Sequence, residues 1–209
     1  MTERFELFGL PRSGTNIVHY ILPHNYDCAL SQAWGNKHYA TKRPLKDKPR
    51  HIIIVVKHPL SWFVSLFHWV EGRYGVSHDF EDLLFTTRSL GMRFVGTAID
   101  HWNQINADWM KMASPEQKVV IIPYERLLTK GDEFCDKIME ELGIERLSKN
   151  FDFPHYKMGT NHCPKHNEKF NFNYYLREKY MDEYHPGLLK KLRKKVDISL
   201  MERLGYARF

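Results

Sequence analysis

The chain of 209 residues is 43% hydrophobic and 27% charged, a balance that excludes wholesale disorder and allows one domain with a continuous core. Its longest aliphatic run, Ile52–Val56, falls far short of the ~18–20 apolar residues of a membrane span, so no transmembrane segment is expected. The net charge of +6 is concentrated in two basic segments, 37–50 and 190–195, which favours a localised anionic ligand over a nucleic acid.

The first half of the chain alternates strand and helix patterns. Five consecutive β-branched residues end the segment His51–Val56, which is typical of a central parallel strand buried on both faces. Pro59 then suits the first turn of a helix. The elements expected up to this point are a strand over 5–10, a polar turn over 11–16, a helix over 17–22 that ends at Pro23, a short strand over 27–31, a basic loop over 40–50, the strand over 51–56 and the helix from Pro59.

In the second half, apolar residues recur at three- and four-residue spacing and predict helices. These patterns predict a helix over 89–112, a buried strand over 118–122, a helix lined by Phe134, Ile138 and Leu142 and ended by Gly143, and a C-terminal helix from Leu189 to Leu204 closed by Gly205. Residues 149–171 are rich in His, Asn, Lys and Pro and show no periodicity, so we expect a functional loop without secondary structure there.

This order of elements predicts an α/β fold of three α/β/α layers around a central parallel sheet, which spans residues 1–209 as a single domain. Ligands of such sheets bind at the carboxyl ends of the strands. Three turns, over residues 11–16, 57–65 and 123–126, are therefore expected to face one crevice.

The cysteines and the first residues bear on the compartment. Cys28, Cys135 and Cys163 are an odd and sparse set that cannot build a disulfide framework. Met1-Thr-Glu-Arg-Phe-Glu6 lacks the basic-then-apolar pattern of a secretory signal and leads straight into a strand-like segment. We therefore expect a cytoplasmic protein.

The first turn has the frame of a phosphate-binding loop. Gly9-Leu-Pro-Arg-Ser-Gly14 fits the pattern G-x-x-x-x-G, which presents backbone N–H groups and a helix N-terminus to an anion. Thr15-Asn16 replaces the lysine and hydroxyl residue of a nucleoside triphosphatase. Arg12 supplies a cation instead, and Ser13, Thr15 and Asn16 supply neutral donors. The loop is expected to bind phosphate without triphosphate machinery; the alternative is an ordinary turn between strand and helix.

The second turn places a cation after the buried strand. Lys57 ends that strand, and Ser65 follows eight residues later on the second turn of the next helix. Both side chains could reach one phosphate near the helix N-terminus. Taken alone, the pair is equally compatible with a solvated strand end and a serine bonded back to its own helix.

Together the two turns resemble those of the PAPS-dependent sulfotransferases, which use 3′-phosphoadenosine-5′-phosphosulfate (PAPS). Pro11-Arg-Ser-Gly-Thr-Asn16 resembles the 5′-phosphosulfate loop of that family. Lys57-x-Pro59 with Ser65 resembles its 3′-phosphate motif, in which arginine is usual and offers a bidentate fork that lysine lacks. The pair Tyr124-Glu125 after the later strand, and the ending from Asp197 to Tyr206, are similar to the corresponding parts of small members.

The resemblance implies a P-loop-like sulfotransferase fold and an enzyme that moves the sulfonyl group of PAPS to a hydroxyl of a small molecule, carbohydrate or glycolipid, without a metal ion. It assigns the cofactor to both motifs, to a tyrosine near adenine, and to two lysines close to where the family has an Arg-Lys-Gly stretch that this chain lacks. The residues implied are Arg12, Ser13, Gly14, Thr15, Asn16, Lys57, Ser65, Tyr124, Lys165 and Lys169.

For catalysis the resemblance implies a histidine base between the two motifs. Trp34-Gly-Asn-Lys37-His38 lies in that interval, and His38 is the expected base because an unperturbed histidine titrates near pH ~6.5. Lys37 and Arg12 would stabilise the leaving phosphate. Lysine and histidine are adjacent here, whereas the family separates them by one residue, and in an extended strand they would point to opposite faces.

Other interpretations stay open. The loop could serve a phosphotransferase of the nucleotide-kinase type, although neither the P-loop lysine nor an acidic residue after the strand 51–56 is present. A non-catalytic nucleotide-binding module would bind the cofactor without turnover. His58 could line the site, and the trio of His162, Cys163 and His166 could hold zinc or form an ordinary polar loop. The segment 190–195 is a solvated helix face or a surface for an acidic acceptor.

Overall fold

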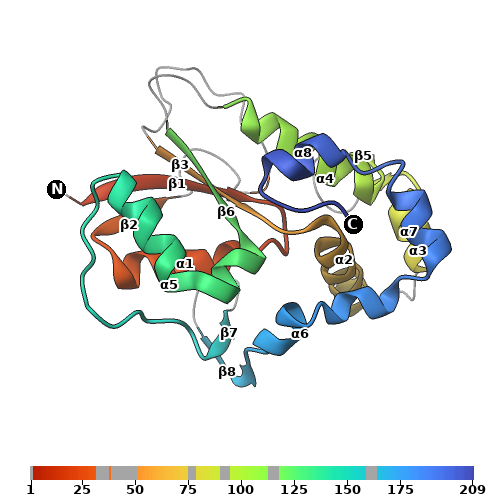
Figure 1. Cartoon of the computed structure of the whole chain (residues 1–209). Helices are drawn as coiled ribbons and strands as arrows, with labels where there is room; N and C mark the ends of the chain where they lie inside the picture. The colour runs from red at the N-terminus through yellow and green to blue at the C-terminus, as the bar shows by residue number, and fades with distance from the viewer. Residues whose placement is uncertain are drawn as a thin grey trace.

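A four-stranded parallel sheet in the order β2-β1-β3-β6 forms the centre of the molecule (Figure 1). Its strands are β1 (Glu3–Gly9), β2 (Cys28–Ser31), β3 (His51–Val56) and β6 (Lys118–Pro123). The structure, a computed structural model, describes residues 2–31, 38, 51–74, 79–89, 95–112, 118–158 and 164–209. The predicted strands over 27–31 and 51–56 are confirmed, while β6 lies at the sheet edge and is only partly buried.

Helices cover both faces of the sheet because alternate residues of β3 enter two separate apolar clusters. Ile52 and Ile54 pack with α2, α4, α7 and α8, and Ile53 and Val55 pack with α1 and α5. Each fully buried aliphatic side chain contributes about 1.5–3 kcal/mol to folding. The predicted three-layer α/β/α fold is confirmed.

The helices and small sheets are α1 (Thr15–Asn25), α2 (Pro59–Tyr74), α3 (Phe80–Phe85), α4 (Ala98–Met110), α5 (Tyr124–Glu141), α6 (Phe172–Leu176), the 3₁₀ helix η2 (Lys179–Glu183), α7 (Pro186–Leu192), α8 (Ile198–Arg203), the pair β4 (Arg88–Ser89) and β5 (Val95–Gly96), and the pair β7 (Tyr156–Met158) and β8 (Pro164–Lys169).

The strand register brings the carboxyl ends of three strands together. Gly9 pairs with Val55, and Val56 pairs with Pro123. The residues that follow β1, β3 and β6 therefore leave the sheet at one edge, as the sequence predicts for the turns over 11–16, 57–65 and 123–126.

Two helix boundaries differ from the prediction. The helix predicted over 89–112 begins only at Ala98, because Thr97 and Asp100 form a capping box in which each side chain binds the other's backbone N–H. The first helix does not end at Pro23 but continues to Asn25. Pro23 lies in the last turn, where the Asn25 amide and the Tyr26 N–H bind the carbonyls of Ile21 and Leu22 and keep the helix end satisfied.

Two further predictions are corrected. Residues 149–171 are not free of secondary structure, because the strands β7 and β8 pair in this stretch and Lys157 forms an ion pair with Glu168 across them at 3.2 Å. The predicted C-terminal helix is two helices, α7 and α8, since the Asp197 side chain accepts a hydrogen bond from the Leu200 N–H and starts a new helix. The predicted helix end at Gly143 is confirmed by its positive φ of 72°.

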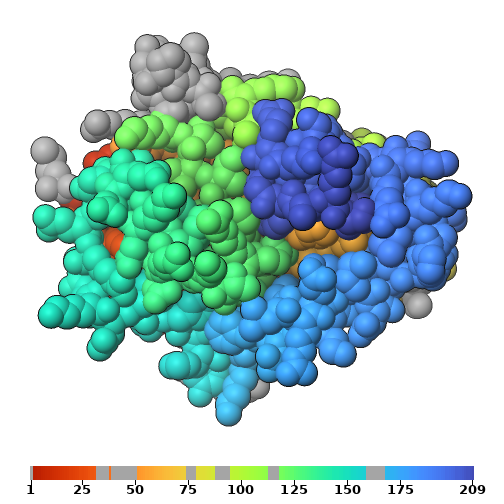
Figure 2. Space-filling model, in the orientation of Figure 1, coloured from red at the N-terminus to blue at the C-terminus, as the bar shows by residue number. Residues whose placement is uncertain are grey.

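The end of the chain packs against the apolar cluster on the α2 side of the sheet. The Tyr206 hydroxyl oxygen lies 3.1 Å from the Val56 carbonyl oxygen, at the carboxyl end of β3. In the space-filling view only a small area of α2, in orange, stays visible between the dark blue C-terminal segment and the lighter blue residues before it (Figure 2). Among the helices of the described residues, none combines the length and the apolar character that crossing a membrane requires.

Candidate functional site

The loop between β1 and α1 is held in a conformation that few residues adopt easily. Arg12 and Gly14 have positive φ angles of 68° and 99°. The Ser13 N–H donates to the Leu10 carbonyl at 3.0 Å, and the buried indole of Trp62 donates to the Pro11 carbonyl at 2.7 Å. Helix α1 begins at Thr15, and its Ile17 and Val18 N–H groups donate to the Gly14 carbonyl at 3.1 and 3.2 Å. The N-terminus of the helix, which favours an anion, therefore directly follows the loop.

Two glycines allow the loop to lie this close to its neighbours. A Cβ atom on Gly9 would lie 2.5 Å from the Ser13 hydroxyl and 2.8 Å from the Val55 carbonyl oxygen. On Gly14 it would lie 2.3 Å from the Tyr124 ring. Packing therefore requires both glycines of the G-x-x-x-x-G frame, and its positive φ is a second reason for glycine at position 14.

Lys57 is a buried cation at the carboxyl end of β3. Its residue is 3% exposed, and its carbonyl accepts a hydrogen bond from the Trp102 indole at 3.0 Å. Its Nζ atom donates to the Tyr175 hydroxyl at 3.3 Å and lies 5.1 Å and 4.7 Å from the ring centres of Tyr124 and Tyr175. No carboxylate in the described part of the chain forms an ion pair with it, so none of the described residues neutralises its charge.

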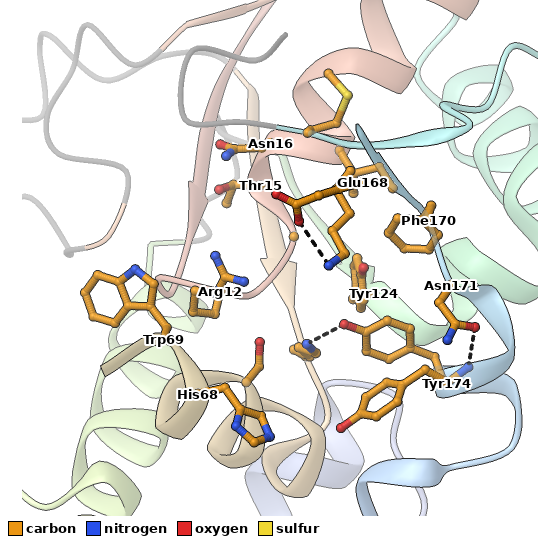
Figure 3. Close-up of a pocket in the computed structure, with 17 residues that line it drawn as sticks. Arg12, Thr15, Asn16, His68, Trp69, Tyr124, Glu168, Phe170, Asn171 and Tyr174 are labelled. Carbon is orange, nitrogen blue, oxygen red and sulfur yellow. Dashed lines mark hydrogen bonds and ion pairs between the residues drawn. The ribbon is translucent and has the colours of Figure 1, made fainter. Parts of the chain in front are cut away.

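A cavity of about 620 Å³ connects the loop with Lys57 (Figure 3). The predicted site residues that line it are Arg12, Gly14, Thr15, Asn16, Lys57, Ser65 and Tyr124. Ser13 does not line it, because its side chain is buried against Gly9, and only its backbone can serve a ligand there. The three turns thus meet in one cavity.

Tyr124 forms part of the cavity wall and is fully covered. Burial, followed by the neighbouring Tyr175 hydroxyl, raises the pKa of Tyr124 well above its usual value. Its ring meets that of Tyr175 edge to face, with centroids 5.2 Å apart. The neutral phenol is therefore the form present near neutral pH.

Glu125, the residue after Tyr124, connects three parts of the fold. Its carboxylate accepts hydrogen bonds from the His58 N–H at 3.2 Å and from the Tyr206 hydroxyl at 2.8 Å. It thereby ties the start of α5 to the end of β3 and to the end of the chain.

The His58 ring packs edge-on against Tyr206, and burial lowers the pKa of His58 to about 4. His58 does not line the cavity, so its suggested place in the site is not supported by its position.

His38 lies beside the base of the loop and does not line the cavity. Its Nδ1 atom is 2.7 Å from the Gly9 carbonyl oxygen. Because a carbonyl oxygen can only accept, Nδ1 carries a hydrogen, and in the neutral ring Nε2 carries the lone pair. Lys37 lies outside the described residues.

Of the two lysines proposed near the 3′-phosphate, only Lys169 has a described side chain. The side chain of Lys165 lies outside the described part of the structure. Lys169, the last residue of β8, is exposed and does not line the cavity, whereas its neighbours Glu168 and Phe170 do. Strand alternation accounts for this, since successive side chains point to opposite faces. The side chains of His162, Cys163 and His166 also lie outside the described residues; within them, no three potential ligands cluster as a metal site.

The sequence patterns missed the part of the cavity wall that comes from α2 and from the segment around α6. On α2 these residues are His68 and Trp69, one turn after Ser65; around α6 they are Asn171, Tyr174 and Tyr175. The helical spacing from Ser65 could have indicated the first pair. The aromatic and asparagine residues of Phe170-Asn-Phe-Asn-Tyr-Tyr175 were a signal for the second group.

Comparison with known proteins bears on the fold. No protein-family model matches the chain, and no curated protein matches it. Among the solved structures that match is the crystal structure of a mouse sulfotransferase, SULT7A1, complexed with PAP. The two superpose with a TM-score of 0.59 over 97% of this chain and 89% of the mouse chain, at 16% sequence identity. The chain therefore has a fold like that of this sulfotransferase.

Proposed function

We propose that the protein transfers a sulfonyl group from PAPS to a hydroxyl group of an acceptor. The observation that carries the proposal is the buried ammonium of Lys57, which has no carboxylate partner among the described residues and shares a cavity with the phosphate-binding loop. A buried charge without compensation is costly. The cavity thus suits a ligand with one anionic group for Lys57 and another for the loop, and PAPS has a 3′-phosphate and a 5′-phosphosulfate.

The cavity residues divide between the two ends of such a nucleotide. Arg12 and the first N–H groups of α1 would hold the 5′-phosphosulfate, together with the side chains of Thr15 and Asn16. Lys57 and Ser65 would hold the 3′-phosphate, and Tyr124 would flank the adenosine. The likeness in fold to a sulfotransferase crystallised with PAP supports this orientation.

The chemistry requires a base and a stabilised leaving group. Bound PAPS supplies a sulfonyl group whose bond to the 5′-phosphate oxygen breaks as the acceptor oxygen bonds to sulfur. His38 takes the hydroxyl proton at Nε2, because its Nδ1–H is held by the Gly9 carbonyl. Arg12 and Lys37 stabilise the charge that the departing phosphate retains.

Two residues disfavour the nucleotide-kinase alternative. Thr15 stands at the position of the P-loop lysine, so no lysine from that position reaches a triphosphate. Lys57 directly follows the strand β3, and a buried ammonium at this place repels Mg²⁺, which binds through carboxylates and phosphates.

The proposal is tested by a transfer screen with PAPS that carries a radiolabelled sulfonyl group, across sugars, glycolipids and phenols. We expect label to appear in at least one hydroxyl-bearing acceptor class without added metal. A variant with the loop cation removed, Arg12→Ala, serves as the matched negative. Tight binding of PAP with no transfer to any class would instead identify a non-catalytic nucleotide-binding module.

A further inference from the structure

The surroundings of Lys57 are aromatic and neutral. Its Nζ atom lies near the faces of Tyr124 and Tyr175 and donates a hydrogen bond to the Tyr175 hydroxyl. Ring faces and a phenol attract a cation but do not neutralise it. An anion that enters the cavity to pair with Lys57 therefore meets the Tyr175 hydroxyl at the same point.

The Tyr175 hydroxyl has a proton to give to such an anion. A phenol has one O–H hydrogen, and its oxygen can accept from other donors. Here the oxygen accepts from Lys57 at 3.3 Å. The Tyr124 and Tyr175 rings meet edge to face with centroids 5.2 Å apart, and Tyr175 lines the cavity. Because the Lys57 ammonium is itself a donor and cannot accept the Tyr175 proton, that proton remains for an anion that enters the cavity.

Residues distant in the sequence form this site. Lys57 and Tyr175 are separated by 118 positions, and Tyr175 belongs to α6, directly after the β7–β8 pair. The side chain of Lys169, at the end of β8, is exposed and lies outside the cavity wall. Within the described residues of 164–176, Tyr175 is thus the side chain that contacts the buried cation.

We infer that Tyr175 is a binding residue for the nucleotide's 3′-phosphate, which accepts hydrogen bonds from the Tyr175 hydroxyl and the Lys57 ammonium together. This rests on the proposed function of the cavity. The consequence is specificity: the pair distinguishes PAP from adenosine 5′-monophosphate (AMP), which is the same nucleotide without the 3′-phosphate. The Tyr175 hydroxyl adds a directional hydrogen bond to the phosphate, whereas a lysine alone acts as a point charge.

The test is a comparison of two ligands on two proteins. Dissociation constants of PAP and AMP are measured by calorimetry for the unmodified protein and for Tyr175→Phe, which removes only the hydroxyl. We expect the substitution to weaken PAP roughly tenfold, as for a lost hydrogen bond to a charged group, and to leave AMP unchanged. Tyr20→Phe is the matched control, because the Tyr20 hydroxyl donates to Asp152 at 2.8 Å and the residue does not line the cavity; it should keep the PAP-to-AMP ratio.

Two outcomes overturn the inference while leaving the proposed function intact. One is an unchanged PAP-to-AMP ratio in Tyr175→Phe. The other appears in a Lys57→Met background: if Tyr175→Phe has no further effect on PAP there, Tyr175 acts only by placing the ammonium. A direct bond predicts a further loss of threefold or more, on the scale of a weak hydrogen bond. Failure of the unmodified protein to bind PAP at all would instead remove the proposed function.

Discussion

Lys57→Met is expected to abolish most PAP binding without unfolding the protein. Methionine keeps the length of the side chain and removes the charge. Loss of a buried charge that pairs with a ligand anion costs on the order of 3 kcal/mol, which corresponds to a loss of about 100-fold in affinity. The free energy of unfolding without ligand should stay the same or rise, because an uncompensated ammonium that is 3% exposed is replaced by an apolar group. Calorimetry with PAP and chemical denaturation measure the two quantities.

The matched control for this substitution is Lys118→Met. Lys118 is the exposed first residue of β6. It lies at the amino end of that strand, whereas the cavity lies at the carboxyl ends of the strands. Its replacement should change the unfolding free energy by no more than about 0.5 kcal/mol and leave PAP binding intact. Equal affinities for PAP in Lys57→Met and the unmodified protein would show that the buried cation is not the anion site.

His38→Ala is expected to keep PAP binding and to lose transfer. Removal of a general base lowers turnover by about 10²- to 10⁴-fold, whereas the cavity that holds the nucleotide does not include the His38 side chain. The measurements are the rate of label transfer at saturating PAPS and the dissociation constant of PAP.

The control for His38→Ala is His155→Ala, which removes an exposed histidine at the start of the β7–β8 segment. That variant should transfer at the rate of the unmodified protein. Full turnover in His38→Ala would assign the base to another residue. A large loss of PAP affinity would mean that the bond between His38 and the Gly9 carbonyl acts by shaping the loop.

The central sheet was predictable because its signals are local. The β-branched run of β3 predicts a strand that is buried on both faces. The polar turn after β1 predicts the start of a helix, and α1 begins directly after Gly14. Helix α4 begins later than its apolar spacing predicts, because that spacing continues upstream of Thr97 whereas the capping box of Thr97 and Asp100 sets the boundary. Strand β8, Pro-Lys-His-Asn-Glu-Lys, has no apolar alternation at all, so hydrophobic patterning cannot find it.

The candidate site was predictable only in part. Lys57 and Ser65 were indicated by their spacing, and the parallel register brings them to the loop residues. The burial of Lys57 beside Tyr175 depends on how a distant aromatic segment folds over the cavity, and no local pattern encodes that contact. Charge and approximate position were the grounds for predicting Lys165 and Lys169 as site residues. The alternation of side chains along β8 turns Lys169 away from the cavity.

The most direct test of the central claim is a calorimetric titration of the unmodified protein with PAP in the presence of a metal chelator, set against a titration with ATP and magnesium. The buried Lys57 and the loop without a P-loop lysine predict that PAP binds without metal and at least tenfold more tightly than Mg-ATP. Tighter binding of Mg-ATP, or no binding of PAP, would contradict the assignment of the cavity to a 3′-phosphorylated sulfonyl donor.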